Sequence, residues 1–292
     1  MSNSNIYYFP ITQNWYYEMM KNRFKDAVVI ITGGASGIGK ALADQLGAQG
    51  ARIIIADRDA IKGAKVAEAL VAKQQDAIYK QVDLVDIAAT KILFDFVAET
   101  YGTIDYVFND AGIFMGGEIR DTPIDRWHEV VRNNIFAVMN GAHFAYQVML
   151  KQGHGSIINL GSAAGLFPVP AMGIYGSTKF AIVGLTLALR NEAKELGIKV
   201  SVVCPTIVDT PLYDTALYNK IDVKKLLRAR KTLQQPDITA QRIIQGVIKN
   251  RATIHTATST KFAWLMFRIA PWAYNLGSVR IIRAYRQKYR QA

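Results

Sequence analysis

The chain has 292 residues, half of them hydrophobic and 20% charged, so it can supply a sizeable core for one large domain or two small ones. Its formal net charge of +12 is unevenly distributed, because ten Lys and Arg but no Asp or Glu follow Asp237. The body is therefore nearly neutral and the tail is basic. A single cysteine, Cys204, excludes an intramolecular disulfide, and the four histidines lack metal-ligand spacing, so we expect no metal site.

The first 25 residues form an aromatic and polar leader without the continuous apolar core of a signal peptide. The sequence contains no run of 18 uninterrupted apolar residues, which disfavours a membrane-spanning helix. We therefore expect a cytoplasmic protein.

After the leader, short β-branched runs alternate with helical stretches. The expected strands are Ala27–Thr32, Arg52–Ala56, Ala77–Val82, Tyr106–Asn109, Ser156–Leu160, Lys199–Cys204 and Ala252–Thr256. The expected helices include Lys40–Ala48, Ala60–Lys73, Ile87–Tyr101 and Trp127–Gln152. Continuous apolar runs are typical of parallel strands that are buried on both faces. The alternation predicts an α/β fold with a doubly wound parallel sheet in a single domain over residues 26–257, followed by a tail over 258–292.

A glycine-rich turn, Thr32-Gly33-Gly34-Ala35-Ser36-Gly37-Ile38-Gly39, connects the first strand to a helix. Glycines let backbone amides approach a pyrophosphate, and the helix N-terminus adds a favourable dipole. Taken alone, such a turn is as consistent with a structural loop as with a phosphate-binding site. Its position between a strand and a helix indicates a dinucleotide site.

Asp57 ends the second strand and lies 18 residues beyond Gly39, where a carboxylate can accept hydrogen bonds from both ribose hydroxyls. This carboxylate would repel a 2′-phosphate, so the sequence favours NAD over NADP as the cofactor. The adjacent Arg58 keeps NADP open, because its guanidinium could pair with that phosphate. The alternative interpretation of Asp57 is an ordinary turn residue at a strand end.

Tyr175 and Lys179 stand four residues apart, on one face of a predicted helix. The pKa of free tyrosine is about 10, and a nearby ammonium group favours the phenolate, so we expect Lys179 to lower the pKa of Tyr175. Tyr175 is then a candidate general acid and base. A second copy of the spacing, Tyr17 and Lys21, has no site-like surroundings, and we interpret it as chance.

Ser162 lies thirteen residues before Tyr175, just after the Ser156–Leu160 strand. Ligands of open parallel sheets bind beyond the carboxyl ends of strands, so this hydroxyl should face the same crevice as the glycine turn. We expect it to hydrogen-bond the substrate oxygen. A nucleophilic role is the rival interpretation, but no recognisable Ser/His/Asp arrangement or nucleophile elbow accompanies it.

Together, the glycine turn, the run Asn109-Asp110-Ala111-Gly112, Ser162 and the Tyr175–Lys179 pair resemble the short-chain dehydrogenase/reductase family. The resemblance covers about residues 26–257 and implies a Rossmann-type sheet of about seven strands in the order 3-2-1-4-5-6-7. It implies that Tyr175 is the proton donor and acceptor, Ser162 orients substrate, and Lys179 binds the nicotinamide ribose. Asn134, seven residues after Trp127, matches an asparagine that holds a relay water; Asn133 is the alternative register.

By the same resemblance, Asp83 corresponds to an adenine-contacting aspartate and Thr210 to a threonine near the carboxamide. The full set of expected cofactor residues is Gly33, Ser36, Gly37, Ile38, Gly39, Asp57, Arg58, Asp83, Leu84, Asn109, Ala111, Gly112, Tyr175, Lys179, Pro205, Val208 and Thr210. Two positions depart from the family pattern: Asp110 replaces an asparagine, and Thr206 replaces a glycine after Pro205. Neither departure removes a catalytic group.

Apolar residues surround the expected reacting centre, in Ile113-Phe114-Met115 and Leu166-Phe167-Pro168-Val169-Pro170. Individually they are as readily packing residues, but together they favour a hydrophobic secondary alcohol or ketone over a sugar. Residues 206–236 are expected to form a substrate lid. The resemblance also implies a homodimer or homotetramer.

In the tail, aromatic and aliphatic residues alternate with cations, which suits a helix at an anionic membrane surface. Pro271 should break any single long helix. The alternative is that these apolar residues cap the core or a dimer contact. No nucleic-acid module accompanies the charge, so nucleic acid is not an expected partner. The alternative function is a membrane-surface cofactor-binding protein with incidental redox activity.

Overall fold

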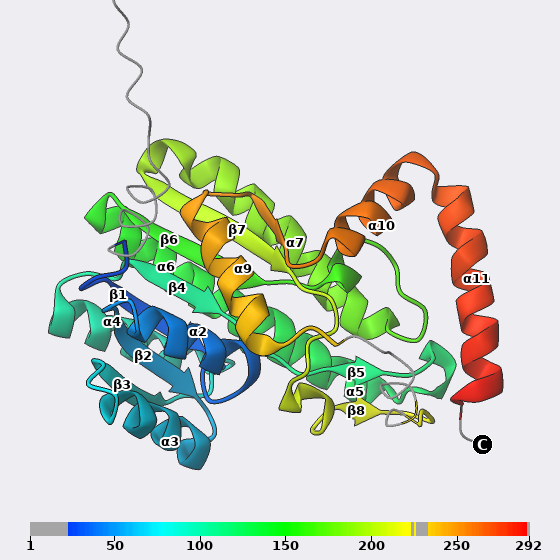
Figure 1. The fold of residues 1–292 in the computed structure, drawn as a ribbon, viewed down its shortest axis with the longest axis horizontal. Coiled ribbons are helices and arrows are strands. Elements are labelled where there is room, and N and C mark those ends of the chain that lie inside the picture. Colours follow the sequence, from blue (N-terminus) through cyan, green and yellow to red (C-terminus); the bar gives the residue numbers. More distant parts are fainter. Residues whose placement is uncertain (1–22, 223–224, 226–232, 291–292) are drawn as a thin grey trace, which may run out of the picture.

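The computed structural model describes residues 23–222, 225 and 233–290, and all statements below concern these residues. Most of the predicted leader and the middle of the predicted lid (223–224 and 226–232) lie outside them. The central feature is a parallel sheet of seven strands in the order β3-β2-β1-β4-β6-β7-β9 (Figure 1). Numbered along the sheet's own strands, this is the predicted order 3-2-1-4-5-6-7, which is confirmed.

The seven strands of the sheet lie close to their predicted ranges. They are β1 (Val28–Thr32), β2 (Arg52–Asp57), β3 (Ala77–Gln81), β4 (Tyr106–Asn109), β6 (Gly155–Leu160), β7 (Ile198–Cys204) and β9 (Thr253–His255). Two further strands, β5 (Met115–Gly116) and β8 (Leu217–Tyr218), pair in parallel as a separate small sheet. Their pairing was not predicted, since two residues carry no periodicity.

Helices cover both faces of the sheet because successive strand residues point to opposite sides. Val29 and Ile31 of β1 pack in one apolar cluster with α2 (Gly37–Gly47), α3 (Ala60–Val71) and α9 (Pro236–Ile248). Val28 and Ile30 pack in a second cluster with residues of α4 (Ile87–Tyr101), α6 (Ala137–Gln152) and α7 (Gly173–Ala193). This is the doubly wound architecture of a single domain.

The stretch predicted as one helix over Trp127–Gln152 has three parts. A first helix, α5 (Ile124–Val131), leads into a π-helical turn, η2 (Arg132–Phe136), and α6 then continues to Gln152. Such π turns insert one residue into an α-helix and are frequent at functional sites. Here the turn carries Asn134, whose side chain is fully buried.

Two helices follow the sheet and form a hairpin at the edge of the molecule: α10 (Thr258–Ile269) and α11 (Pro271–Lys288) (Figure 1). Ala270 between them has a non-helical backbone, as expected for a residue that precedes proline. The prediction that Pro271 interrupts the helix is confirmed. Among the described residues, no helix combines the length and the apolar character needed to cross a bilayer.

Candidate active site

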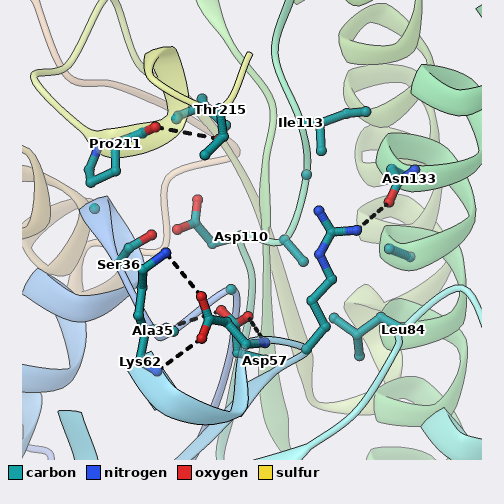
Figure 2. A pocket seen from close by; sticks show the side chains of 18 of the residues that line it. Ala35, Ser36, Asp57, Lys62, Leu84, Asp110, Ile113, Asn133, Pro211 and Thr215 are labelled. Atoms are coloured by element: carbon teal, nitrogen blue, oxygen red, sulfur yellow. Dashed lines mark hydrogen bonds and ion pairs between the residues drawn. The ribbon is translucent and has the colours of Figure 1, made fainter. Parts of the chain in front are cut away.

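Two adjoining cavities open at the carboxyl ends of the central strands. The first is lined by residues of the glycine-rich turn and reaches Asp57 (Figure 2). Asp83 also lines it. The second has a volume of about 630 Å³ and is lined by Ser162, Tyr175 and Lys179. Asp110 and Gly112 are among the residues that line both cavities, so the two form one continuous crevice.

The glycine turn leaves room for a ligand because its glycines occupy positions that other residues could not. Gly33 has a φ of +68°, and a Cβ there would lie 2.9 Å from the Ala111 nitrogen. Gly37 has a φ of +55° at the first residue of α2. A Cβ at Gly39 would lie 2.5 Å from the Gly33 carbonyl oxygen, so this glycine permits close packing of helix and turn. The backbone conformation therefore fits a dinucleotide pyrophosphate at the N-terminus of α2.

Asp57 lies at the far end of the first cavity, where its carboxylate is held by the backbone. Its two oxygens accept hydrogen bonds from the Ala35 nitrogen at 3.2 Å and the Asp59 nitrogen at 3.0 Å. Arg58 turns its guanidinium toward Asn133, to which it donates at 3.4 Å, as the dashed line in Figure 2 shows. The structure thus presents both an oriented carboxylate and a cation at the place where a ribose would bind.

Most of the predicted cofactor residues line the crevice. Those in the first cavity are Gly33, Ser36, Gly37, Ile38, Asp57, Arg58, Asp83, Leu84, Ala111, Gly112 and Thr210. Those in the second are Tyr175, Lys179, Pro205 and Val208, with Ile38, Gly112 and Thr210 shared by both.

Gly39 and Asn109 line neither of these cavities. Asn109 is buried in the sheet and donates from Nδ2 to Asn159 Oδ1 at 2.8 Å, while Asn159 donates onward to Thr186 at 3.0 Å. Its side chain therefore ties β4 to β6 and α7, and we assign it to the scaffold.

Tyr175 and Ser162 bring their hydroxyl groups together in the second cavity. A hydrogen bond with Ser162 favours the phenolate of Tyr175, but burial outweighs it and raises the pKa of the phenol above its ordinary value. The ring lies edge-on to Phe114, with centroids 4.9 Å apart, which fixes its direction. Ser162 Oγ also accepts from the Ala164 nitrogen at 3.2 Å, so its remaining donor is available to the phenol or to a ligand.

The ammonium nitrogen of Lys179 lies over the Tyr175 ring, 5.6 Å from its centre. It donates to the Leu160 carbonyl at 2.9 Å and is almost fully buried. Burial lowers the pKa of this lysine to about 8. The expected lowering of the Tyr175 pKa by Lys179 is therefore not found in the chain alone: burial is the largest effect on both groups, and it raises the pKa of Tyr175 and lowers that of Lys179.

Asn134 connects the loop after β4 to the helix that carries Tyr175. Its Oδ1 accepts from the Ile113 nitrogen at 2.7 Å, and its Nδ2 donates to the Ile113 carbonyl at 3.0 Å and to Thr178 Oγ1 at 3.1 Å. Asn133, the alternative register, lies at the first cavity beside Arg58. Of the two, Asn134 is the residue next to the candidate catalytic helix.

Asp110 lies at the junction of the two cavities and is a site residue that was not among those predicted. The sequence marks it as a departure from the family's asparagine that removes no catalytic group. In the structure its carboxyl lies in the crevice near Asp57 (Figure 2), and the charge of Lys179 acts on it. Desolvation raises its pKa to about 7, and the charge of Lys179 acts in the opposite direction. The sequence feature that indicates this role is the carboxyl group of Asp110, at a position where the family motif has an amide.

The second cavity is walled largely by apolar side chains from distant parts of the chain. They include the predicted Ile113, Phe114, Phe167 and Val169, together with Met172 and with Tyr213 and Leu212 from the start of the lid. Ser259, Thr260 and Ala263 of α10 complete the wall. The contribution of α10 was not predicted.

Comparison with known proteins agrees with this geometry. The family model described as short chain dehydrogenase matches residues 27–220. An uncharacterized oxidoreductase of Staphylococcus aureus (strain USA300) is 34% identical over 202 residues, which cover 69% of this chain and 85% of that protein. Cyclohexanol dehydrogenase of Acinetobacter sp. (strain SE19) is 32% identical over 244 residues, which cover 82% of this chain and 95% of the dehydrogenase.

A solved short chain dehydrogenase/reductase from Burkholderia phymatum, in complex with NAD, superimposes with a TM-score of 0.78. It is 27% identical, and the match covers 84% of this chain and 94% of that chain. The sheet order, the crevice and these matches lead to one conclusion: the chain belongs to the short-chain dehydrogenase/reductase family of oxidoreductases.

Proposed function

We propose that this oxidoreductase interconverts a hydrophobic secondary alcohol and the corresponding ketone, with NAD as the cofactor. The observation that carries the proposal is the pair of hydroxyl groups, Ser162 and Tyr175, which meet at the wall of an apolar cavity that adjoins the glycine-lined one. Two hydroxyls in one cavity can hold a single substrate oxygen between them. When bound, the nicotinamide accepts or supplies the hydride.

In the direction of oxidation, the Ser162 hydroxyl holds the substrate oxygen and Tyr175 Oη takes the proton from the substrate hydroxyl. Reduction runs the same steps in reverse, with Tyr175 Oη giving the proton to the ketone oxygen. The buried phenol resists ionisation in the chain alone. An additional positive charge in the crevice would favour the phenolate, and Lys179 is held in place for this by the Leu160 carbonyl.

The proton then leaves through Lys179 and a water beside Asn134. Both amide donors of Asn134 are used within the chain, so the water would be held by a carbonyl oxygen of this residue. Lys179 suits the relay because its lowered pKa lets the amine give up and regain a proton near neutral pH.

Asp57 supports NAD as the cofactor, because an oriented carboxylate pairs with ribose hydroxyls and repels a phosphate. The related Burkholderia phymatum structure contains NAD. Arg58 supports the alternative, NADP, but its guanidinium is already directed to Asn133. Separate titrations with NAD and NADP will distinguish the two.

The apolar wall of the second cavity supports a hydrophobic substrate, and a related protein is a cyclohexanol dehydrogenase. The test is to incubate the purified chain with NAD or NADP and a series of cyclic and aliphatic secondary alcohols, following the absorbance of the reduced cofactor. Tyr175→Phe should abolish turnover while cofactor binding is retained. Tyr146→Phe, on α6 away from both cavities, is the control. Normal turnover by Tyr175→Phe would refute the assignment.

A further inference from the structure

The outer face of the α10–α11 hairpin carries a line of exposed apolar side chains. On α10 they are spaced three and seven residues apart, and on α11 four and seven, so each set lies on one face of its helix. We call these six residues the hairpin strip: Phe262, Leu265, Ile269, Trp272, Leu276 and Val279. The most exposed are Ile269 at 72% and Trp272 at 70%, which flank the junction between the helices. The strip is therefore centred on the bend of the hairpin.

Exposed cations border this strip. Lys261 and Arg268 stand on α10, and Arg280 and Arg283 stand in the middle and second half of α11. No acidic residue occurs anywhere in the sequence from 238 onward. Farther along, Arg286 donates to Glu118 with distances down to 2.6 Å, and Arg290 pairs with Asp121 at 2.9 Å. The cations nearest the strip thus face solvent, while Arg286 and Arg290 anchor the hairpin.

The inner face of the hairpin is fastened to the substrate cavity. Ser259, Thr260 and Ala263 of α10 line the cavity wall. Tyr274 of α11 donates from its hydroxyl to the Pro168 carbonyl at 2.5 Å, and its ring lies 5.6 Å from that of Phe167, another cavity residue. One face of the hairpin therefore forms part of the cavity, and the opposite face carries the strip.

We propose that the hairpin strip binds in the plane of an anionic phospholipid surface and places the substrate cavity at the lipid boundary. Apolar side chains would enter the acyl region, while the bordering cations pair with anionic headgroups. The substrate is then an alcohol or ketone that partitions into lipid and reaches the cavity beside α10. This last statement rests on the function proposed above; the binding itself does not.

The cations beside the hairpin strip favour an anionic lipid surface as its partner over a second copy of the chain or a nucleic acid. In a twofold contact with a second copy, the same surface meets itself, and the cations of the two hairpins would be brought together without acidic partners on either hairpin. Binding of nucleic acid would use the cations but leave six apolar side chains without a role. An anionic bilayer satisfies both features.

The experiment is vesicle flotation of the full chain with phosphatidylcholine alone and with phosphatidylcholine plus phosphatidylserine. The double variant Ile269→Ser/Trp272→Ser should bind the anionic vesicles at least roughly tenfold more weakly than the wild type. Its matched control is Ile61→Ser/Ile92→Ser, which removes two isoleucines of 70% and 68% exposure from α3 and α4. The control should float like the wild type.

A second pair of variants tests the charges. Arg280→Glu/Arg283→Glu should abolish the preference for phosphatidylserine, whereas Lys194→Glu/Lys199→Glu, two exposed lysines elsewhere with the same change in charge, should keep it. Added salt should weaken binding by the wild type in the same direction.

Three results would overturn the proposal: the wild type fails to float with anionic vesicles, the strip variant floats as well as its control, or the strip mediates self-association in lipid-free sedimentation. Turnover of a water-soluble secondary alcohol without vesicles is measured in parallel. The strip variant should keep it, because its two positions do not line the cavity. If the strip variant loses flotation but keeps turnover, the strip acts in membrane binding and not in catalysis. If the wild type shows no turnover at all, the proposed function fails while the flotation result still stands.

Discussion

The ammonium group of Lys179 lies over the ring of Tyr175, 5.6 Å from its centre, and donates to the Leu160 carbonyl at 2.9 Å. Both residues are buried, so the lysine has a lowered pKa of about 8 and the pKa of the tyrosine is raised. Burial therefore favours the neutral form of both groups in the chain alone. Sequence spacing alone suggested a simpler situation, in which the cation acidifies the phenol.

Lys179→Met should lower turnover by roughly two to four orders of magnitude, as expected when a positioned proton-transfer group is removed. It should also weaken NAD binding, measured by quenching of protein fluorescence. Lys65→Met, an exposed lysine on α3, provides the control. A Lys179→Met enzyme within a few-fold of the wild-type rate would remove Lys179 from the proposed relay.

Asp57→Asn should raise the dissociation constant for NAD by roughly tenfold to a hundredfold, because hydrogen bonds to a charged group are worth about 1.5–3 kcal/mol. The dissociation constant for NADP should change less, so the preference for NAD over NADP becomes smaller. Asp86→Asn, at the start of α4, controls for the loss of a carboxylate that accepts from a backbone nitrogen, here that of Ala89. An unchanged ratio of the two constants would mean that Asp57 does not contact the ribose.

Asp110→Asn should change how stability depends on pH. The folded chain raises the pKa of Asp110 from 3.8 to about 7, so the protonated form is the one that the fold favours. Its contribution to stability is present below pH 4 and is lost as the pH rises toward 7.

The wild type should therefore lose stability relative to Asp110→Asn between pH 4 and 7, by about 1–2 kcal/mol because water in the open crevice screens part of the effect. Urea unfolding of both proteins across this range measures it. Parallel stability curves for the two proteins would contradict a buried, destabilised carboxylate.

Asn134→Ala should lower the free energy of unfolding by about 1–3 kcal/mol, because it leaves the Ile113 backbone groups without their partners. If Asn134 also positions the water of the proton relay, turnover should fall by more than the loss of folded enzyme explains. The solvent deuterium isotope effect on turnover should also change. Asn133→Ala, the preceding residue of the same π turn, should leave the isotope effect unchanged. Equal isotope effects in all three proteins would restrict Asn134 to a structural role.

Much of the fold follows from local patterns. The seven main strands are β-branched or apolar runs, and the helix Ile87–Tyr101 has the predicted ends because Asp86 caps its start and Gly102 adopts a left-handed conformation at its end. The pair β5–β8 and the π turn at Asn134 could not be predicted in this way. The first depends on residues about a hundred positions apart, and the second on one residue inserted into a helix whose period otherwise continues.

The sequence by itself determined the main strands, the helices between them and the glycine turn, because each depends on a short-range pattern that local backbone preferences enforce. The sheet order and the candidate residues Asn134, Ser162, Tyr175 and Lys179 came from the resemblance of the combined motifs to a known family. Only the tertiary structure decided the pKa shifts of the site residues and the position of the C-terminal helices relative to the sheet. Burial, which no spacing encodes, raised the pKa of both Tyr175 and Asp110. Ion pairs between Arg286 and Glu118, far apart in the chain, hold the last helix against the segment after β5, since only folding brings such distant charges together.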